Sequence, residues 1–461
     1  MRSMEHDCDL SSLELLKKLG QEKKNLIAVG KLRSKKDKKV TTTGVPFSIP
    51  NHWVWARLRD ISIIQEGPGI RKHQYTEEGV QFLTVTNILE GSVDLNKSQK
   101  YVSFEEYDTK YRHFELDRND IVIACSGGSW GKSAVFDHDD KMILNTSTLR
   151  LRFFGDIGDN KYLYYLTKGR FFNKQIEAQL SGQQPNFGYS HYSVVQVPLP
   201  PKQEQKRIVA ILDQAFADIE QARAKTEQNL KNARELFESY LQQVFSQRGE
   251  GWVETTLGDE IDILTGFAFK SKEYVEHADS TPLIRGDNIV QGKLRWDGVK
   301  LWANNKVDEY EKYLLKADDI VIAMDRTWVK AGMKFSKITA KDLPALLVQR
   351  VARLRCTDSI DPDYLYHLVG SKLFESYVLS IQTGLGVPHI SGKQIQSFSF
   401  FRPNIDQQKV IVSTMNKLAS EVLRLNQIYQ SKLESIDELK KSILKKTFSG
   451  ELTKQQEGAA A

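Results

Sequence analysis

Two long stretches of the chain, residues 204–247 and 406–448, alternate apolar and polar positions in the same way. Apolar side chains recur there at alternating steps of four and three residues, which is the heptad spacing of coiled-coil helices. Both series share a polar position, Asn229 in the first and Lys432 in the second, at the same phase. The first series is Ile208, Leu212, Ala215, Ile219, Ala222, Thr226, Asn229, Ala233, Leu236 and Tyr240, and the second is Ile411, Met415, Leu418, Val422, Leu425, Tyr429, Lys432, Ile436, Leu439 and Ile443.

A proline stands three residues before the first acidic residue of each stretch, at Pro201 and Pro403. Because proline cannot continue a helix backwards, it marks where each helix is predicted to start. At about 1.5 Å per residue, each helix would be roughly 65 Å long. A helix of that length is stabilised by a partner helix. The order of domain, helix, domain, helix favours antiparallel pairing of the two, since the ends of a domain often lie close together.

The region before the first long helix has the short apolar runs and the alternation that are typical of strands. A continuous apolar run such as Ile121–Ala124 predicts a strand that is buried on both faces. The residues from Tyr162 to Leu180 predict a helix. The strands are predicted at residues 53–58, 82–85, 120–124 and 149–153.

The region before the second long helix repeats these signals in the same order. Asp120–Ala124 recurs as Asp319–Ala323, and Tyr162–Leu166 recurs as Tyr364–Leu368. The sequence therefore indicates a tandem duplication of a unit of about 200 residues, and each copy of the unit consists of one domain and one long helix. The loops between the matched strands differ, so one scaffold can carry two sets of loops that recognise different targets; neutral drift in surface loops is the alternative.

The sequence therefore predicts an α+β protein in which two repeated globular domains are separated by a pair of long antiparallel coiled-coil helices with an internal pseudo-two-fold. A short amphipathic helix over residues 11–28, capped by Ser11 or Ser12, precedes the first domain. The expected boundaries are 1–45 for this helix and a basic arm, 46–201 for the first domain, 202–248 for the first helix, 249–403 for the second domain, 404–450 for the second helix and 451–461 for a tail.

Composition and charge narrow the class of protein. The chain of 461 residues is 40% apolar and 27% charged, and it contains no apolar run long enough to span a membrane. It has three cysteines at spacings that suit neither a metal site nor a disulfide framework, so we expect a reducing, cytoplasmic location. Residues 1–45 hold 11 Lys and Arg against 6 Asp and Glu, which accounts for most of the net charge of +6. The basic run Lys31–Lys39 is either a solvated loop or an arm that contacts DNA phosphates.

Two motifs are similar to motifs of enzymes, but each lacks a residue that the enzyme motif requires. The run Ser126–Ser133 is similar to a phosphate-binding loop, but that loop needs glycine where Ser126 stands. The tetrapeptide Asp361–Tyr364 is similar to a motif of amino-methyltransferases, but its third residue differs, and Asp361 with Pro362 is better explained as a helix start. The nine histidines form no metal-binding pattern. No catalytic, metal or cofactor site is therefore predicted on this chain.

Three stretches and their order carry a resemblance to a known family. They are Leu199–Ile208 at the start of the first long helix, Leu439–Leu452 at the end of the second, and Ile49–Trp55 at the start of the first domain. With the tandem layout, they make the chain resemble the specificity (S) subunit of type I restriction–modification systems over nearly its whole length. The N-terminal helix resembles one found in part of that family.

The resemblance implies that each domain is a target recognition domain that reads one half of a split, asymmetric double-stranded DNA sequence. The helices would then set the spacing between the halves and hold two methyltransferase subunits, to which two motor–endonuclease subunits are added. S-adenosylmethionine, ATP and Mg²⁺ would belong to those partners, and this chain would be non-catalytic. A two-headed adaptor that binds proteins and no DNA is the main alternative, and an enzyme with a genuine phosphate loop is a further one.

Direct reading of bases needs Arg, Lys, Asn, Gln or His side chains in the variable loops. In the first domain the candidates are Arg71, Lys72, His73, Lys132, Gln183, Gln184, Asn186 and His191. In the second domain they are Lys270, Lys272, Arg326, Lys330, His389 and Lys393.

A second set of apolar positions on the long helices also repeats, and a two-helix seam does not need it. These side chains are expected to dock partner subunits, or alternatively to contact the chain's own domains. They are Val209, Leu230, Leu241, Phe245, Val412, Leu433, Leu444 and Phe448.

Overall fold

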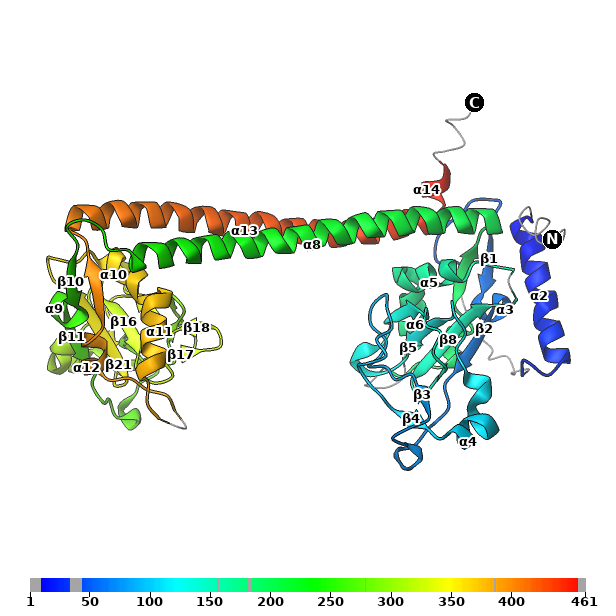
Figure 1. Cartoon of the computed structure of the whole chain (residues 1–461), viewed down its shortest axis with the longest axis horizontal. Helices are drawn as coiled ribbons and strands as arrows, with labels where there is room; N and C mark the ends of the chain where they lie inside the picture. Colours follow the sequence, from blue (N-terminus) through cyan, green and yellow to red (C-terminus); the bar gives the residue numbers. More distant parts are fainter. Residues whose placement is uncertain are drawn as a thin grey trace. The chain divides into compact units, whose positions relative to one another are not determined.

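The computed structural model of the chain describes residues 10–33, 44–155, 157–180, 185–277, 279–384 and 387–454. The structure divides into two compact units, one of residues 1–224 and 433–461 and one of residues 225–432 (Figure 1). Each unit contains one globular domain, part of the first long helix and part of the second.

The domain of the first unit is built on two small sheets and a strand pair. Its four-stranded sheet is antiparallel and has the order β2-β8-β5-β6, and its three-stranded sheet has the order β4-β3-β7. A separate antiparallel pair, β1 with β9, joins the start of the domain to its end. The bounds are β1 Val54–Arg57, β2 Ser62–Glu66, β3 Val80–Phe82, β4 Tyr101–Val102, β5 Ile121–Ala124, β6 Ser133–Val135, β7 Met142–Ile143, β8 Thr148–Phe153 and β9 Gln196–Leu199.

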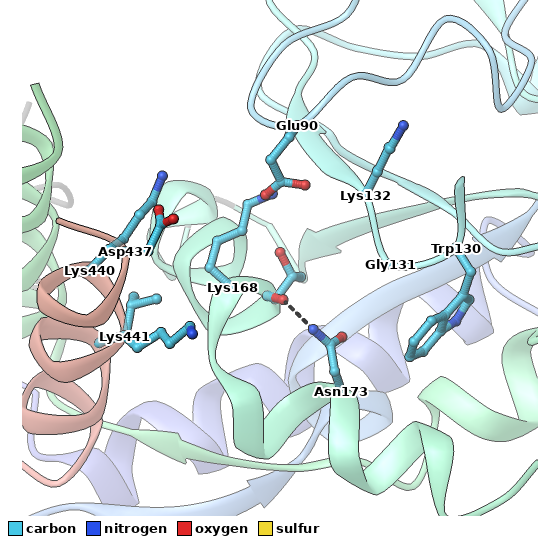
Figure 2. Close-up of a pocket in the computed structure, with 11 residues that line it drawn as sticks. Glu90, Trp130, Gly131, Lys132, Lys168, Asn173, Asp437, Lys440 and Lys441 are labelled. Atoms are coloured by element: carbon cyan, nitrogen blue, oxygen red, sulfur yellow. Dashed lines mark hydrogen bonds and ion pairs between the residues drawn. The ribbon is translucent and has the colours of Figure 1, made fainter. Parts of the chain in front are cut away.

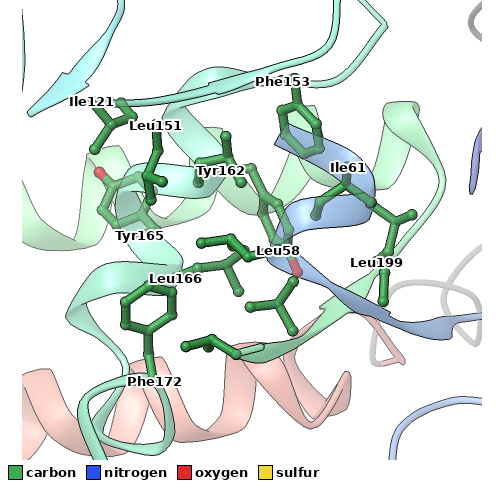
Figure 3. Close-up of a cluster of buried hydrophobic side chains, with 14 of the residues drawn as sticks. Leu58, Ile61, Ile121, Leu151, Phe153, Tyr162, Tyr165, Leu166, Phe172 and Leu199 are labelled. Atoms are coloured by element: carbon green, nitrogen blue, oxygen red, sulfur yellow. The ribbon is translucent and has the colours of Figure 1, made fainter. Parts of the chain in front are cut away.

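Two helices, α5 (Asn160–Lys168) and α6 (Arg170–Glu177), pack beside these strands. Figure 3 shows Tyr162 and Leu166 of α5 among the apolar side chains of the sheet. The Tyr162 hydroxyl is fully buried and donates to the Pro198 carbonyl at 2.9 Å, so its polar end is satisfied inside the core. The N-terminal helix α2 (Ser12–Ala28) buries Leu15 and Leu19 in the same core.

The domain of the second unit repeats this topology strand for strand. Its four-stranded sheet has the order β11-β21-β16-β19, its three-stranded sheet has the order β15-β12-β20, and β10 pairs with β22. Two short hairpins, β13-β14 and β17-β18, are added. The bounds are β10 Val253–Thr256, β11 Ile261–Thr265, β12 Ser280–Ile284, β13 Ile289–Val290, β14 Lys293–Leu294, β15 Lys300–Ala303, β16 Ile320–Ala323, β17 Trp328–Val329, β18 Gly332–Met333, β19 Phe335–Lys337, β20 Leu346–Leu347, β21 Val351–Cys356 and β22 Ser399–Arg402, with helices α10 Pro362–Val369, α11 Lys372–Ile381 and α12 Gly392–Gln396.

Most predicted elements of the domains are present, with two differences. The predicted strand over residues 82–85 ends at Phe82, because the following residues form a turn. The predicted helix Tyr162–Leu180 is two helices, because Gly169 adopts an extended conformation between α5 and α6. The predicted start of α10 is confirmed: the Asp361 side chain accepts from the backbone N–H groups of Asp363 and Tyr364.

The long helices are α8 (Lys202–Ser246) and α13 (Ile405–Phe448). They run antiparallel within each unit. In the first unit, Arg223 pairs with Asp437, and Glu220 pairs with Lys440 at 3.2 Å. In the second unit, Arg234 Nε donates to Asn426 Oδ1 at 3.4 Å.

Most of the predicted seam is buried or half-buried, but Leu236, Lys432 and Leu439 are exposed. The seam prediction is wrong at these positions. A straight helix drifts by about 20° per heptad from a strict seven-residue repeat, so its apolar face leaves the partner helix. Near the end of α8, the buried side chains are instead Val244 and Phe245, which pack into the second domain.

One glutamine at the start of each long helix fixes the helix to its domain. Asp159 N–H donates to Gln205 Oε1 at 3.0 Å, and Gln205 Nε2 donates to the carbonyl of Pro200 at 2.9 Å. In the second unit, Gln408 makes the corresponding bonds with Asp361 N–H at 2.8 Å and with the Pro403 carbonyl at 2.9 Å. Both glutamines are fully buried.

Candidate nucleic-acid interface

Three loops meet beside the end of the central strand in each domain. In the first domain, the loop after β5 forms an isolated bridge with the segment that follows α6, between Ser126 and Asn186. In the second domain, the loop after β16 makes the matching bridge between Asp325 and His389. The third loop is the one that leads into β8 or β21, and it bonds to the residue after the central strand. These clusters, here called the recognition loops, hold many of the polar residues singled out in the sequence.

The run Ser126–Ser133 does not form a phosphate-binding loop. Residues Gly127–Ser129 make one turn of 3-10 helix, and the chain then continues into strand β6. A phosphate-binding loop would lead into a helix whose N-terminus faces the anion. The geometry therefore argues against the enzyme hypothesis based on this loop.

Lys132 lies at a cavity of about 450 Å³ in the first unit (Figure 2). Lys168 of α5 and the α13 residues Lys440 and Lys441 also line it, with Glu90 and Asp437 as the acidic residues. Burial lowers the pKa of Lys168, while its ion pair with Glu90 opposes that shift. Four lysines against two carboxylates give this cavity an excess of positive charge.

The other candidates of the first domain divide into three groups. Arg71, Lys72 and His73 are exposed at the start of a short 3-10 turn, and Asn186 is exposed in the recognition loops. His191 is half-buried, and its Nδ1 accepts from Gly188 N–H at 3.1 Å, so the ring supports the local fold. Gln183 and Gln184 lie outside the described residues.

The candidates of the second domain are mostly exposed. Arg326 and Lys330 lie in the loop after β16, whereas His389 is half-buried beside it. The remaining candidates, Lys270, Lys272 and Lys393, are exposed on other loops and on α12.

Four cationic residues of this domain were missed by the sequence reasoning: Arg285, Arg295, Lys334 and Arg350. Lys334 is half-buried, and burial lowers its pKa; the neighbouring Arg295 and Arg326 act in the same direction, and Asp287 and Asp325 oppose it. The signal was available for Arg350, because it aligns with Ser147 in the repeat and differs from it in charge.

Most of the predicted docking residues pack against the chain's own domains. Val209, Leu444 and Phe448 belong to the core of the first unit. Val412, Phe245 and Leu241 pack in the core of the second unit. Only Leu230 and Leu433 of this set lie outside those cores among the described residues, and both are half-buried. Of the two alternatives, docking of partner subunits and contact with the chain's own domains, the structure therefore shows contact with the domains for six of the eight side chains.

Other exposed apolar side chains occupy the long helices. In the second unit they are Leu236, Val410, Leu423 and Ile428, and in the first unit Leu439. Among the described residues, no group of three or more His, Cys, Asp or Glu side chains could hold a metal ion. Within the same ranges, no helix combines the length and the apolar character needed to cross a bilayer.

The duplicated fold, its divergent loops and the paired helices define a class of proteins that carry two related domains on one pair of long helices. The family model described as type I restriction modification DNA specificity domain matches this chain twice, over residues 50–229 and 249–435. The chain belongs to this family. One matched segment lies in each of the two repeats that the sequence predicted. DNA sequence recognition is thus supported over the alternative of an adaptor that binds no DNA.

Relatives match over most of the chain. The chain is similar to the type I restriction enzyme EcoAI specificity subunit of Escherichia coli, with 25% identity over 92% of this chain and 87% of that protein. It is also similar to the type I restriction enzyme MjaVIII specificity subunit of Methanocaldococcus jannaschii, with 24% identity over 88% of this chain and 94% of that protein.

Solved structures support the fold. The HsdS subunit from Thermoanaerobacter tengcongensis matches with a TM-score of 0.60 and 20% identity, over 88% of this chain and 98% of that one. A chain from a structural study of complex assembly and conformational transition in the type I R-M system matches with a TM-score of 0.71 and 20% identity, over 88% of this chain and 100% of that one.

Proposed function

We propose that each domain reads one half of a bipartite, asymmetric DNA target through its recognition loops. The observation that carries this proposal is the pairing of one topology with two different loop sets. Strand order is the same in both domains, yet the loop after β5 carries Gly127 and Gly128 where the loop after β16 carries Arg326 and Thr327. Two similar scaffolds with different loop chemistry suit two different half-sites.

The charge of the loops supports contact with DNA. Arg285, Arg295, Arg326, Lys334 and Arg350 in the second domain outnumber the acidic Asp287 and Asp325 beside them. Cationic side chains on the phosphates supply affinity, and the same residue types at groove depth distinguish bases. The cavity with four lysines in the first unit has the same sign of charge.

We propose that the long helices set the number of unread base pairs between the half-sites. At about 1.5 Å per residue, a helix of the length of α8 extends about as far as two turns of DNA. Gln205 and Gln408 tie the first turn of each helix to its domain, so changes in helix length would be passed to the domains.

Catalysis is proposed to belong to partner subunits. Two methyltransferase subunits would use S-adenosylmethionine, and two motor–endonuclease subunits would use ATP and Mg²⁺, in line with the family to which this chain belongs. The exposed apolar side chains of the helices, among them Leu236 and Leu423, are the positions proposed to contact partners. This replaces most of the docking residues expected from sequence, because those are buried in the domains.

The test is an exchange of residues 46–201 for the first domain of another family member, followed by mapping of the DNA bases methylated by the assembled complex. The proposal expects one half of the target to change while the other half and the spacing remain. Removal of one heptad, residues 221–227, is expected to change the spacing or the assembly and to leave both half-sites unaltered. A change in both halves after the domain exchange would contradict independent reading.

A further inference from the structure

The backbone of the recognition loops is similar in the two domains at a position where one domain has glycine and the other has arginine. In the first domain, Gly127 has a φ of 63°, and its N–H donates to the Pro185 carbonyl at 3.2 Å. In the second domain, Arg326 has a φ of 47°, and its N–H donates to the Pro388 carbonyl at 2.6 Å. The same turn therefore carries no side chain in one domain and a cation in the other.

A second position repeats this relation on the neighbouring loop. Cys125 N–H donates to the carbonyl of Ser147, which has a φ of 67°, at 2.7 Å. Met324 N–H donates to the carbonyl of Arg350, which has a φ of 66°, at 2.8 Å. Again the fold supplies one backbone geometry, and the second domain adds an arginine to it.

Arginine is a poor choice for these positions on conformational grounds. A positive φ in this range crowds the Cβ atom against the backbone, which is why glycine or a short polar residue usually occupies it. The second domain therefore accepts backbone strain at two adjacent loops, and such strain is concentrated at functional sites.

These two arginine side chains make few contacts that would stabilise the fold. Within the described residues, the structure records no hydrogen bond from the Arg326 side chain, and Arg326 is exposed. Arg350 pairs with Asp325 at 3.6 Å, and 65% of its side chain is exposed, so that pair is weak. Asp325 precedes Arg326 directly, which places both arginines on one cluster of loops.

We propose that Arg326 and Arg350 are base-reading residues of the second domain and that its half-site contains guanine at the positions they reach. This inference rests on the proposed function and names the chemistry of one half of the target. The planar guanidinium group donates two hydrogen bonds to O6 and N7 of guanine in the major groove, which is the commonest specific contact of this kind. The first domain has Gly127 and Ser147 at the matched positions and so cannot read its half-site in this way.

The test uses the full chain assembled with its methyltransferase subunits and three variants. Arg326→Gly and Arg350→Ser install the residue types of the first domain at the same backbone positions. Asp318→Gly is the matched control, because Asp318 has a φ of 70° and lies at the opposite end of β16. Arg326→Gly removes the crowded Cβ atom, so its melting temperature is expected to stay the same or to rise by about 2–4 °C. Arg350→Ser keeps a Cβ atom at the same φ and is expected to melt with the wild type. Asp318→Gly removes a Cβ atom together with an exposed ion pair to Lys337 at 3.4 Å, so its melting temperature is expected to change little. The melting temperatures therefore separate a folding defect from a loss of recognition.

Methylated sites are mapped for each complex, and DNA binding is measured on the wild-type target and on targets with one base pair replaced. The second half-site is the half that does not change when residues 46–201 are exchanged. The inference expects each arginine variant to lose discrimination at one G·C pair of that half by roughly 10- to 100-fold, with the first half-site and the Asp318→Gly complex unaffected.

Several results would overturn the inference. A wild-type second half-site made only of A·T pairs leaves no guanine to read. Equal weakening on every DNA sequence with a smaller salt dependence would assign the arginines to phosphates. Unchanged discrimination in both variants would remove any role in recognition. A wild-type complex that methylates no two-part target would remove the proposed function as well, whereas the other three results leave it standing.

Discussion

Replacement of Gln408 by alanine tests how the second domain is fixed to its helix. The Gln408 side chain is fully buried, and it makes three hydrogen bonds, from Asp361 N–H at 2.8 Å and to the carbonyls of Pro403 at 2.9 Å and Ser359 at 3.0 Å. Alanine removes the side-chain amide, so the Asp361 N–H and the carbonyls of Pro403 and Ser359 each lose a hydrogen bond at this buried position. At about 0.5–1.5 kcal/mol for each bond, the free energy of unfolding should fall by about 2–4 kcal/mol.

For a unit of this size, that loss corresponds to a fall of about 5–15 °C in the melting temperature. The assay is thermal unfolding together with hydrogen exchange at the Asp361 amide, which should lose protection. Lys409→Ala is the control, because Lys409 is the next residue of α13 and is exposed. Gln205→Ala, with two recorded bonds, should cost less. The reasoning is refuted if Gln408→Ala melts with Lys409→Ala and the Asp361 amide stays protected.

Three further predictions concern charge, pH and partner binding. Asp319→Ala should lower the free energy of unfolding by about 3–5 kcal/mol in urea titrations, because it leaves Arg355 without its buried carboxylate, whereas Asp137→Ala at an exposed pair should have far less effect. Burial lowers the pKa of His367 from its ordinary value of 6.5, so its contribution to stability is present above pH 6.5 and is lost as the pH falls through the lowered pKa. His367→Gln should therefore reduce the fall in the free energy of unfolding that urea titrations measure between about pH 7.5 and about pH 5.5. An unchanged pH dependence in this variant would count against the prediction. Leu423→Glu should weaken co-purification with methyltransferase subunits while leaving the melting temperature unchanged, because 61% of Leu423 is exposed, and equal co-purification would argue against that surface.

The duplication was predictable from sequence because the core strands of the two repeats have similar sequences. Buried strands such as Ile121–Ala124 and Ile320–Ala323 must keep the same apolar character, since both faces are covered, and this made the repeat visible. The long helices were predictable for the same reason, because their apolar positions recur along one face.

The surfaces were less predictable. Heptad spacing shows that a position is apolar but does not show what covers it, so the sequence leaves both partner subunits and the chain's own domain as covers for Val209 and Phe448. The structure places both side chains in the core of the first unit. The difference in charge between Arg350 and the aligned Ser147 is visible in the sequence, but the place of Arg350 beside Arg326 depends on a positive φ and on the bond from Met324 N–H to the Arg350 carbonyl, which only the structure shows. Loop residues carry no periodic pattern, so their roles follow from geometry.

The most direct measurement maps the methylated bases of host DNA with this gene present and absent. The account predicts a target that appears only with the gene and that consists of two short, different sequences separated by a fixed number of unread base pairs. A continuous target, or a gap that varies from site to site, would contradict two domains that read DNA from one pair of helices.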